Sequence, residues 1–358
     1  MTKPFAPDKR WPVAILGATG AVGQTFVRLL ANHPWFKIAE VAASERSEGK
    51  PYAEAAKWLE GEMPASIARM TVLPTDPKRV SSPIVFSALD SSVAGDVEKA
   101  FACAGRFVLS NAKNFRMDAD VPLVIPEVNA SHLQLIERQR RERGWSGAIV
   151  TNANCAATVA AVALAPLHER FGVDKLFMTT MQAVSGAGYP GVPSMDILGN
   201  VIPYIADEEP KLELEMLKLL GSYEGEAVKF ADMKVSTHTN RVAVEHGHMI
   251  AITASFHERV TPNAALETLR AWKGDESTWD LPSRPDKPLA VSDDPARPQP
   301  RRDVNAGGGM TVTVGRVRED PILDIRMIAM GHNTIRGAAG GSVLNAELLA
   351  ATGRLPDA

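Results

Sequence analysis

The sequence predicts an α/β protein whose first half is built around a parallel sheet. Three observations lead to this prediction: the length of 358 residues, a glycine-rich turn between an apolar strand and a helix near the N-terminus, and further apolar runs that stop in small polar residues. This length corresponds to about two domains of roughly 150 residues each. We expect the first domain to span residues 1–150 and the second residues 151–335, with a terminal helix at 336–358 completing the first.

The first predicted strand, residues 13–16, runs into a turn with the spacing G-x-x-G-x-x-G and then into a helix. This spacing differs from the common G-x-G-x-x-G fingerprint, but its glycines serve the same purpose. They allow a tight turn and a close approach of the backbone to a pyrophosphate, while the helix points its N-terminus at the negative charge. The alternative is a structural turn that binds no ligand. We predict a Rossmann-like, dinucleotide-binding domain, with these contacts from the turn: Gly17, Thr19, Gly20, Ala21 and Val22.

The segment after the second predicted strand, residues 37–44, indicates which dinucleotide is bound. Proteins that bind unphosphorylated NAD usually place an acid here to hold the ribose hydroxyl groups. This chain instead reads Ser44-Glu45-Arg46-Ser47, and arginine and serine side chains suit a 2′-phosphate. We therefore predict NADP as the cofactor, bound by Ser44, Arg46 and Ser47. In the alternative, Glu45 holds the ribose and Arg46 only faces solvent.

Two further strands are predicted, beginning near residues 83 and 106, where apolar runs stop in small polar residues. The first ends at Ser87 to Ser92 and the second at Ser110–Asn111. In an open α/β sheet, cofactors and substrates bind at the carboxyl ends of the strands, so we expect Ser87 to contact the cofactor. The proline-rich residues 284–303 are expected to form a surface loop.

Composition and charge exclude several classes of protein. The net charge of -3 argues against a dedicated nucleic-acid-binding protein, which carries a basic excess or stripe. Two cysteines, Cys103 and Cys155, are too few for a disulfide framework or a four-cysteine zinc site, and we expect no metal. The N-terminus has no apolar signal core and no run of about 20 apolar residues occurs, so we expect a cytoplasmic protein that does not bind a membrane.

The segment after Asn154 is rich in alanine and predicts a helix that ends near Gly172. Asn154 is a plausible N-cap, which places Cys155 in the first turn. There the helix dipole and the free backbone N–H groups favour the thiolate, and the same groups can stabilise an oxyanion on a carbonyl that the thiolate attacks. The alternative is a small buried apolar residue, a common role of free cysteines.

A thiolate nucleophile needs a partner for proton transfer, which is normally a histidine. Three candidates, His238, His246 and His248, lie close to Arg241 on a strand-like segment. Their spacing alone does not choose among them, because histidines in strands are more often structural than catalytic.

Two further segments have an unusual composition. Gln182 opens a loop that is rich in glycine and serine. Glu208 and Lys211 begin an amphipathic helix, whose charges, taken on the pattern alone, indicate a face in contact with solvent. The pattern by itself assigns neither segment a role.

Seven motifs occur in the order found in one family. They are GATGAVG, SNAKNFRM, NANC, QAVSGAGYPGVPSMD, DEEPKLELE, HTNRVAVEHGH and GHNTIRGAAGGSVLNAE. On these motifs, from about Val13 to Leu349, the chain resembles the aspartate-β-semialdehyde dehydrogenase family in its archaeal and fungal-type branch. The resemblance implies a second domain of the semialdehyde dehydrogenase (glyceraldehyde-3-phosphate dehydrogenase-like) type, an α+β domain for catalysis and oligomerisation.

The resemblance also implies roles for individual residues. The catalytic residues are Cys155 as the nucleophile, His248 as the acid/base and Gln182 as the residue that positions the substrate. The implied substrate-binding residues are Arg241 for the α-carboxylate, Glu208 for the ammonium group, Lys211 and Arg116 for the phosphate, and Asn154. The implied cofactor contacts near the nicotinamide are Ser185, Gly186 and Asn333.

The activity implied by the resemblance is the NADPH-dependent reduction of L-aspartyl-4-phosphate to L-aspartate 4-semialdehyde, with release of inorganic phosphate, in lysine, threonine and methionine biosynthesis. A homodimer or homotetramer is implied as well. An acyl-CoA reductase acting on malonyl-CoA, an N-acetyl-glutamyl-phosphate reductase and a non-enzymatic NADP-binding sensor are the alternatives. Three residues depart from the pattern usual in relatives: Ala156, Pro210 and His246.

Overall fold

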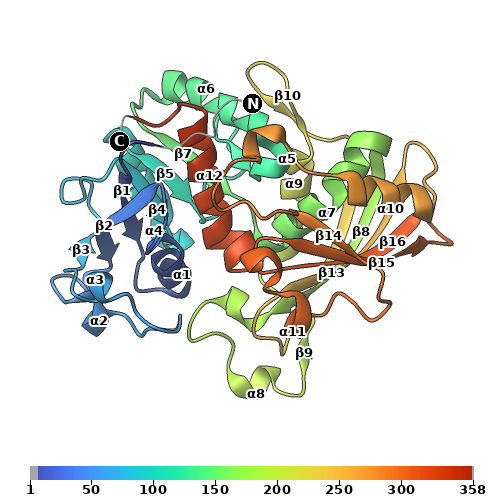
Figure 1. Ribbon diagram of the computed structural model, residues 1–358, viewed down its shortest axis with the longest axis horizontal. Coiled ribbons are helices and arrows are strands. Elements are labelled where there is room, and N and C mark those ends of the chain that lie inside the picture. The colour runs from blue at the N-terminus through green and yellow to red at the C-terminus, as the bar shows by residue number, and fades with distance from the viewer. Residues whose placement is uncertain (1–6, 357–358) are drawn as a thin grey trace.

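The computed structural model describes residues 7–356, which form two seven-stranded sheets joined by helices (Figure 1). The first sheet is parallel, in the order β3-β2-β1-β4-β5-β7-β6. Its strands are buried apolar runs, as expected for a sheet covered on both faces. Their bounds are Trp11–Leu16 (β1), Phe36–Ala43 (β2), Leu73–Pro74 (β3), Ile84–Ser87 (β4), Phe107–Ser110 (β5), Leu123–Val124 (β6) and Ala148–Asn152 (β7).

Helices α1 (Ala21–Leu30), α4 (Ser91–Cys103) and α6 (Leu135–Arg143) accompany this sheet, and the terminal helix α12 (Gly340–Ala351) joins them. A π-helical turn, Ile335–Ala339, leads into α12. Helix α12 is buried along its first eleven residues and packs against β5 and β7, so the end of the chain returns to the first sheet (Figure 1).

The second sheet is mixed, in the order β14-β15-β16-β13-β8-β12-β9. Helices α7 (Cys155–Phe171) and α10 (Pro262–Ala271) pack on it, while β13 alternates buried and half-buried residues and Phe177 on β8 is exposed. One face of this sheet therefore carries the core and the other is only partly covered. The strand bounds are Val173–Ala183 (β8), Val201–Ile202 (β9), Lys234–Val242 (β12), His248–Phe256 (β13), Leu289–Ser292 (β14), Val312–Glu319 (β15) and Ile325–Gly331 (β16).

The remaining elements are short, apart from helix α9 (Glu208–Leu219), which lies beside β12 and α7. The short helices are Tyr52–Ala55 (α2), Ala65–Ala68 (α3), Pro126–Asn129 (α5), Ser194–Ile197 (α8) and Pro300–Asp303 (α11). The 3-10 turns are Ala130–Gln134, Val184–Ala187, Glu276–Thr278 and Ala306–Gly309. Ser222–Tyr223 (β10) and Val228–Lys229 (β11) form a small hairpin. Within residues 7–356 there is no helix whose length and apolarity would allow it to cross a membrane.

One sequence-based expectation was wrong in detail. Residues 284–303 are more than a surface loop: they contain strand β14, which joins the second sheet, and helix α11, where buried Asp303 accepts a hydrogen bond from Gln299 N–H at 2.6 Å. The two strands expected to end at Ser87 to Ser92 and at Ser110–Asn111 are confirmed, because β4 ends at Ser87 and β5 at Ser110.

Candidate active site

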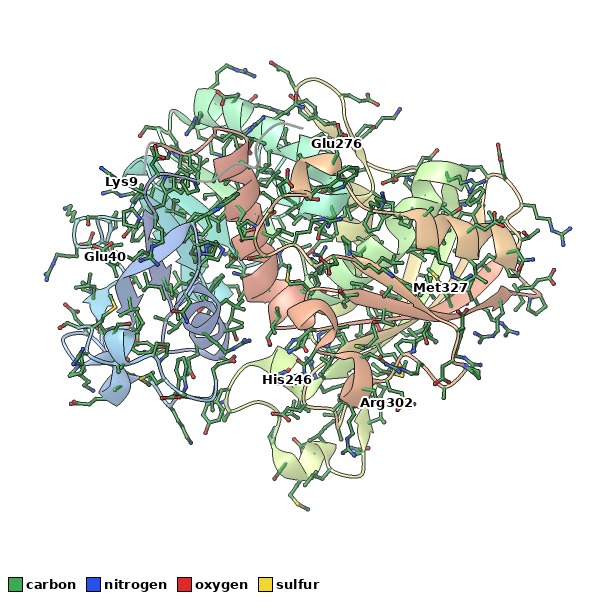
Figure 2. All side chains as sticks on the ribbon, in the orientation of Figure 1. Lys9, Glu40, His246, Glu276, Arg302 and Met327 are labelled. Carbon is green, nitrogen blue, oxygen red and sulfur yellow. The ribbon has the colours of Figure 1, made fainter. Side chains whose placement is uncertain are left out.

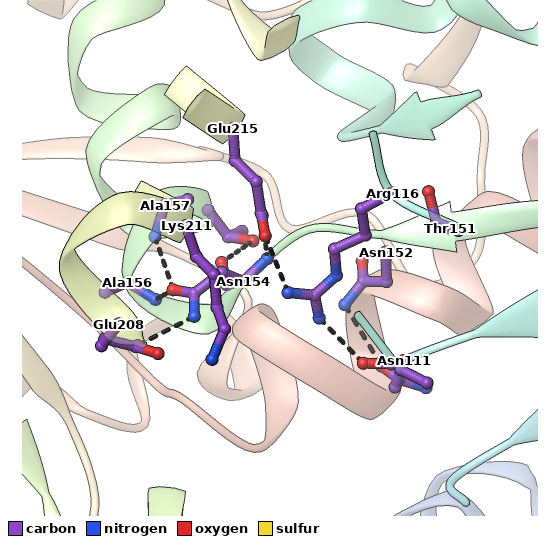
Figure 3. Close-up of polar contacts among 12 residues, drawn as sticks. Asn111, Arg116, Thr151, Asn152, Asn154, Ala156, Ala157, Glu208, Lys211 and Glu215 are labelled. Carbon is purple, nitrogen blue, oxygen red and sulfur yellow. Dashed lines mark hydrogen bonds and ion pairs between the residues drawn. The ribbon is translucent and has the colours of Figure 1, made fainter. Parts of the chain in front are cut away.

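Cys155 is the first residue of α7, and the predicted N-cap is confirmed. The Asn154 side-chain oxygen accepts the N–H groups of Ala156 at 2.8 Å and Ala157 at 3.2 Å (Figure 3). These two N–H groups are therefore not available to an oxyanion, contrary to our expectation for the helix start. Among residues 7–356, the Cys155 N–H remains as the unpaired donor of this first turn. Cys155 itself is partly exposed, whereas Asn154 is buried.

The Cys155 thiol lies against His248, whose Nε2 is 3.0 Å from the Cys155 Sγ. His248 is completely buried at the start of β13, and its Nδ1 accepts the N–H of Ala183 at 3.1 Å. Because Nδ1 is an acceptor, a neutral His248 carries its proton on Nε2 and donates toward the sulfur. The structure thus distinguishes the three histidines: His238 is exposed beside Phe177, and His246 contacts Ser185 instead of the thiol.

The charge balance favours a neutral pair of thiol and imidazole when no ligand is bound. Burial raises the pKa of the Cys155 thiol to about 12, and the Glu208 carboxylate adds to this shift, while Arg116 and Arg241 oppose it. Burial lowers the pKa of His248 to about 3, and the positive charge of Arg241 contributes. Desolvation, the largest cause of the shift in the Cys155 pKa, therefore opposes the thiolate that we expected at the helix start.

Glu208, the first residue of α9, holds two predicted site residues together. Its Oε1 accepts the Nδ2–H of Asn154 at 2.8 Å and the Nε2–H of Gln182 at 3.1 Å. Glu209 points elsewhere and accepts the N–H of Thr239 at 2.9 Å. The assignment of Glu208 rather than Glu209 to the site thus agrees with the geometry, and Pro210 does not prevent the helix from beginning at Glu208.

Arg241 and Gln182 are register partners on the adjacent parallel strands β12 and β8. The Arg241 Nη1 donates to the Ala183 carbonyl at 2.8 Å, and within residues 7–356 its other N–H groups have no hydrogen-bond partner. Gly186 lies close to the guanidinium of Arg241 and to the ring of His248. A Cβ at position 186 would lie 2.9 Å from Arg241 Nη1 and 3.1 Å from His248 Cε1. A side chain at 186 would therefore displace the groups that surround the thiol.

Arg116 is buried and anchored by a carboxylate that the sequence reasoning missed. Its Nη1 donates to Glu215 Oε1 at 2.9 Å, and its Nη2 donates to the Asn111 carbonyl at 2.8 Å (Figure 3). The second oxygen of Glu215 accepts the Asn154 N–H at 2.6 Å. Glu215 therefore ties the predicted phosphate-binding arginine to the cap of the helix that carries Cys155.

Lys218, one turn further along α9, supports the same segment. Its Nζ donates to the carbonyls of Arg116, Asp118 and Val121 at 2.7, 2.8 and 2.8 Å, and burial lowers the pKa of Lys218 to about 8. Glu208, Glu215 and Lys218 are all buried, so the interpretation of this helix as a solvated face was wrong. Their spacing of seven and then three residues was the signal for one shared helix face. Lys211 is half-buried and its Nζ contacts the Ala206 carbonyl at 3.5 Å.

The turn between β1 and α1 has the form of an anion-binding cradle. Gly17 has a φ of +68°, and a Cβ there would lie 2.5 Å from the Ala88 carbonyl oxygen. Gly20 is the N-cap of α1 without a side-chain cap, so the N–H groups of Ala21 and Val22 are left for a ligand. Ala21 also lines a cavity of about 440 Å³, shared with residues 184–198, His246 and Thr334. These features fit a dinucleotide.

The other predicted cofactor contacts fall into three groups. Ser185 lines this cavity, and Asn333 Nδ2 donates to Ser185 Oγ at 2.8 Å. Ser44, Arg46 and Ser47 lie in the turn after β2, with Ser44 and Arg46 exposed. Thr19 belongs to the β1–α1 turn and Ser87 closes β4, so both lie at the carboxyl edge of the first sheet.

Comparison with known proteins agrees with this arrangement. Residues 12–136 match the model of the semialdehyde dehydrogenase NAD-binding domain, and residues 164–336 match that of the semialdehyde dehydrogenase dimerisation domain. An aspartate-semialdehyde dehydrogenase of Archaeoglobus fulgidus is 50% identical over 95% of this chain and 98% of its own length. A malonyl-CoA reductase (NADP) of Metallosphaera sedula is 41% identical over 95% of this chain and 97% of its own.

The fold has a solved counterpart in the aspartate-semialdehyde dehydrogenase of Candida albicans with NADP. That structure superposes with a TM-score of 0.89 at 42% identity, covering 97% of this chain and all of the other. The α/β fold predicted from the sequence is confirmed by this match and by the parallel sheet. The chain belongs to the semialdehyde dehydrogenase family.

Proposed function

We propose that this protein is an NADP-dependent, phosphorylating aspartate-semialdehyde dehydrogenase. The observation that carries the proposal is the 3.0 Å contact between Cys155 Sγ and His248 Nε2, surrounded by Arg241, Arg116 and Glu208. An amino-acid acyl phosphate carries a carboxylate, an ammonium group and a phosphate, and this set of side chains is complementary to all three. The A. fulgidus and C. albicans relatives bear that enzyme name.

The carboxylate of the substrate is assigned to Arg241, whose unpaired N–H groups suit a two-pronged contact. Glu208 would accept a hydrogen bond from the ammonium group. The phosphate would lie near Arg116 and Lys211, which Figure 3 shows together with Glu208. Gln182 is held by Glu208 and positions the acyl group beside Cys155. A bound phosphate and carboxylate place negative charge near both arginines.

In the biosynthetic direction, the Cys155 sulfur forms a bond to the acyl carbon of L-aspartyl-4-phosphate. The carbon–oxygen bond to phosphate breaks, and the thiol proton leaves with inorganic phosphate, which gives a thioester on the enzyme. The Cys155 N–H, unpaired among residues 7–356, and the Nε2–H of His248 beside the sulfur would stabilise the negative charge that develops on the carbonyl oxygen. Once the thioester carbon has been reduced, the carbon–sulfur bond breaks and the sulfur leaves as a thiolate that accepts the Nε2–H of His248. A proton taken up from solvent through His248 restores the Cys155 thiol, and L-aspartate 4-semialdehyde is released.

The dinucleotide would be held by the β1–α1 turn, by Ser44, Arg46 and Ser47 at the adenosine end, and by Ser185, Gly186 and Asn333 at the nicotinamide end. NADPH supplies the hydride that reduces the thioester. Ser87, at the end of β4, would complete the cofactor site at the carboxyl edge of the first sheet.

We assign the cofactor to residues 1–150 together with 336–358, and catalysis and oligomerisation to 151–335. The match to a dimerisation domain and the partly covered face of the second sheet support a homodimer or homotetramer. The two free cysteines suit the reducing cytoplasm, where we place the enzyme.

Two assays in parallel test the proposal. One follows phosphate-dependent reduction of NADP by L-aspartate 4-semialdehyde, and the other follows oxidation of NADPH with malonyl-CoA. We expect activity in the first, abolished by alkylation of Cys155. Activity only in the second would assign the protein to the chemistry of its M. sedula relative, and NADPH binding without turnover in either would contradict an enzymatic role.

A further inference from the structure

His246 lines the cavity that we assign to the dinucleotide, and its side chain has no part in the chemistry above. It lies in the loop between β12 and β13, two residues before His248, and lines the cavity of about 440 Å³ together with Ser185 and Thr334. In Figure 2, His246 lies near the middle of the view, above the segment that contains α8. Its side chain is 38% exposed, so it can exchange protons with solvent.

A chain of hydrogen bonds connects His246 to the nicotinamide contacts. Asn333 Oδ1 accepts the N–H of Gly247 at 2.9 Å, which fixes the orientation of the amide and directs Nδ2–H to Ser185 Oγ at 2.8 Å. Ser185 Oγ also lies 3.0 Å from His246 Nδ1. Because the serine oxygen already accepts from Asn333, its own proton is directed by the state of His246.

The neutral form of His246 holds the serine proton. Glu245 Oε1 lies 3.8 Å from His246 Nε2, which favours a proton on Nε2 and leaves Nδ1 as an acceptor. Ser185 then donates to Nδ1 and has no proton to offer a ligand. When His246 is protonated, Nδ1–H donates to Ser185 Oγ, and the serine hydroxyl is released to donate into the cavity.

The ring that stacks on His246 is held neutral by its surroundings. His332 stacks on His246 with ring centroids 4.9 Å apart, and burial lowers the pKa of His332 to about 3, with His246 and Arg28 contributing. His332 Nδ1 accepts the N–H groups of Thr334 and Ile335, so that ring stays neutral and fixed. Glu60 lines the same cavity and is paired with Arg28 at 2.6 Å.

We propose that His246 is a positioning residue for the cofactor: its protonation turns the Ser185 hydroxyl into the cavity, where it donates to the nicotinamide dinucleotide and strengthens binding. The inference rests on the proposed function, because it needs the dinucleotide in this cavity. The contribution is present when His246 is charged and is lost when it is neutral, so it weakens as the pH rises. Binding of the dinucleotide should therefore be accompanied by uptake of a proton.

Calorimetric titration of the full-length protein with NADP⁺ tests this inference, in buffers of differing ionisation enthalpy and at pH values from about 6 to about 8. The 2′-phosphate also titrates near pH 6, so the decisive comparison is between the wild type and His246→Asn. We expect the wild type to gain about three- to tenfold in affinity at the lower pH relative to His246→Asn, the range of one hydrogen bond. Ser185→Ala should lose the same gain in NADP⁺ affinity at lower pH. His257→Asn, a control at an exposed histidine, should retain this gain.

Two results would overturn the inference while leaving the proposed function intact. One is NADP⁺ binding by His246→Asn with the pH dependence and proton uptake of the wild type. The other is full pH dependence in Ser185→Ala, which would show that the charge of His246 acts without the serine. If the wild-type protein failed to bind NADP⁺ at all, the proposed cofactor and this inference would fall together.

Discussion

Replacement of Glu215 by glutamine tests whether one buried carboxylate joins the two halves of the site. The carboxylate accepts the Asn154 N–H at 2.6 Å and Arg116 Nη1 at 2.9 Å, and its side chain is 2% exposed. Glutamine has one oxygen, so its NH₂ group would face one of these donors. The variant loses one hydrogen bond to a charged group and leaves the buried arginine without its counter-ion, which together cost about 1.5 to 3 kcal/mol or more.

The assay is urea unfolding of wild type and Glu215→Gln, at one protein concentration. Glu142→Gln is the control, because Glu142 is paired with Arg138 at 2.8 Å but is 45% exposed, and such pairs contribute about 0.5 kcal/mol. Steady-state kinetics should also show a raised KM for phosphate, since Arg116 loses its anchor. If Glu215→Gln unfolded at the same urea concentration as Glu142→Gln, with an unchanged KM for phosphate, the linking role of Glu215 would be refuted.

Three further predictions concern the thiol, its surroundings and the first sheet. Cys155→Ala should have no measurable turnover, whereas His248→Ala should retain activity lowered about 10²- to 10⁴-fold in the NADP absorbance assay; normal turnover in Cys155→Ala would contradict covalent catalysis. Gly186→Ala should lower kcat on the order of 100-fold with an unchanged melting temperature, because its Cβ would lie 2.9 Å from Arg241 Nη1; an unchanged kcat would show that Arg241 and His248 tolerate displacement. Burial raises the pKa of Glu98 from 4.5 to about 7, so the stability it contributes is complete below pH 4.5 and is lost as the pH rises through 7. Urea unfolding should find Glu98→Gln more stable than wild type by about 1 to 3 kcal/mol near pH 8 and no more stable near pH 4.5; equal stability of the two at both pH values would argue against the shift.

The sequence was informative where a local pattern determines the structure. The glycine turn between an apolar strand and a helix predicted the β1–α1 unit, and Asn154 before an alanine-rich run predicted the cap and start of α7. Both depend on neighbours within a few residues. The motif resemblance chose His248 among three histidines, and the structure places that residue, and neither of the others, against Cys155.

The features of the site that could not be predicted from the sequence depend on contacts between distant segments. Glu215 and Lys218 look like ordinary charges of an amphipathic helix until α9 is packed against the loop around Arg116, about 100 residues earlier. The tautomer of His248 is set by the backbone N–H of Ala183. Because this contact involves a backbone group, the residue types in the sequence do not indicate it. Desolvation of Cys155 likewise follows from tertiary packing, which is why the local expectation of a thiolate did not hold.

The most direct test of the account is intact-protein and peptide mass spectrometry after mixing the protein with L-aspartate 4-semialdehyde and NADP in the absence of phosphate. Without phosphate to release it, the acyl group should accumulate as a thioester on the peptide that contains Cys155, and later addition of phosphate should remove it. The account predicts this adduct in the wild type and none in Cys155→Ala. An adduct on another residue, or turnover with phosphate but no acylated Cys155 at any time, would contradict it.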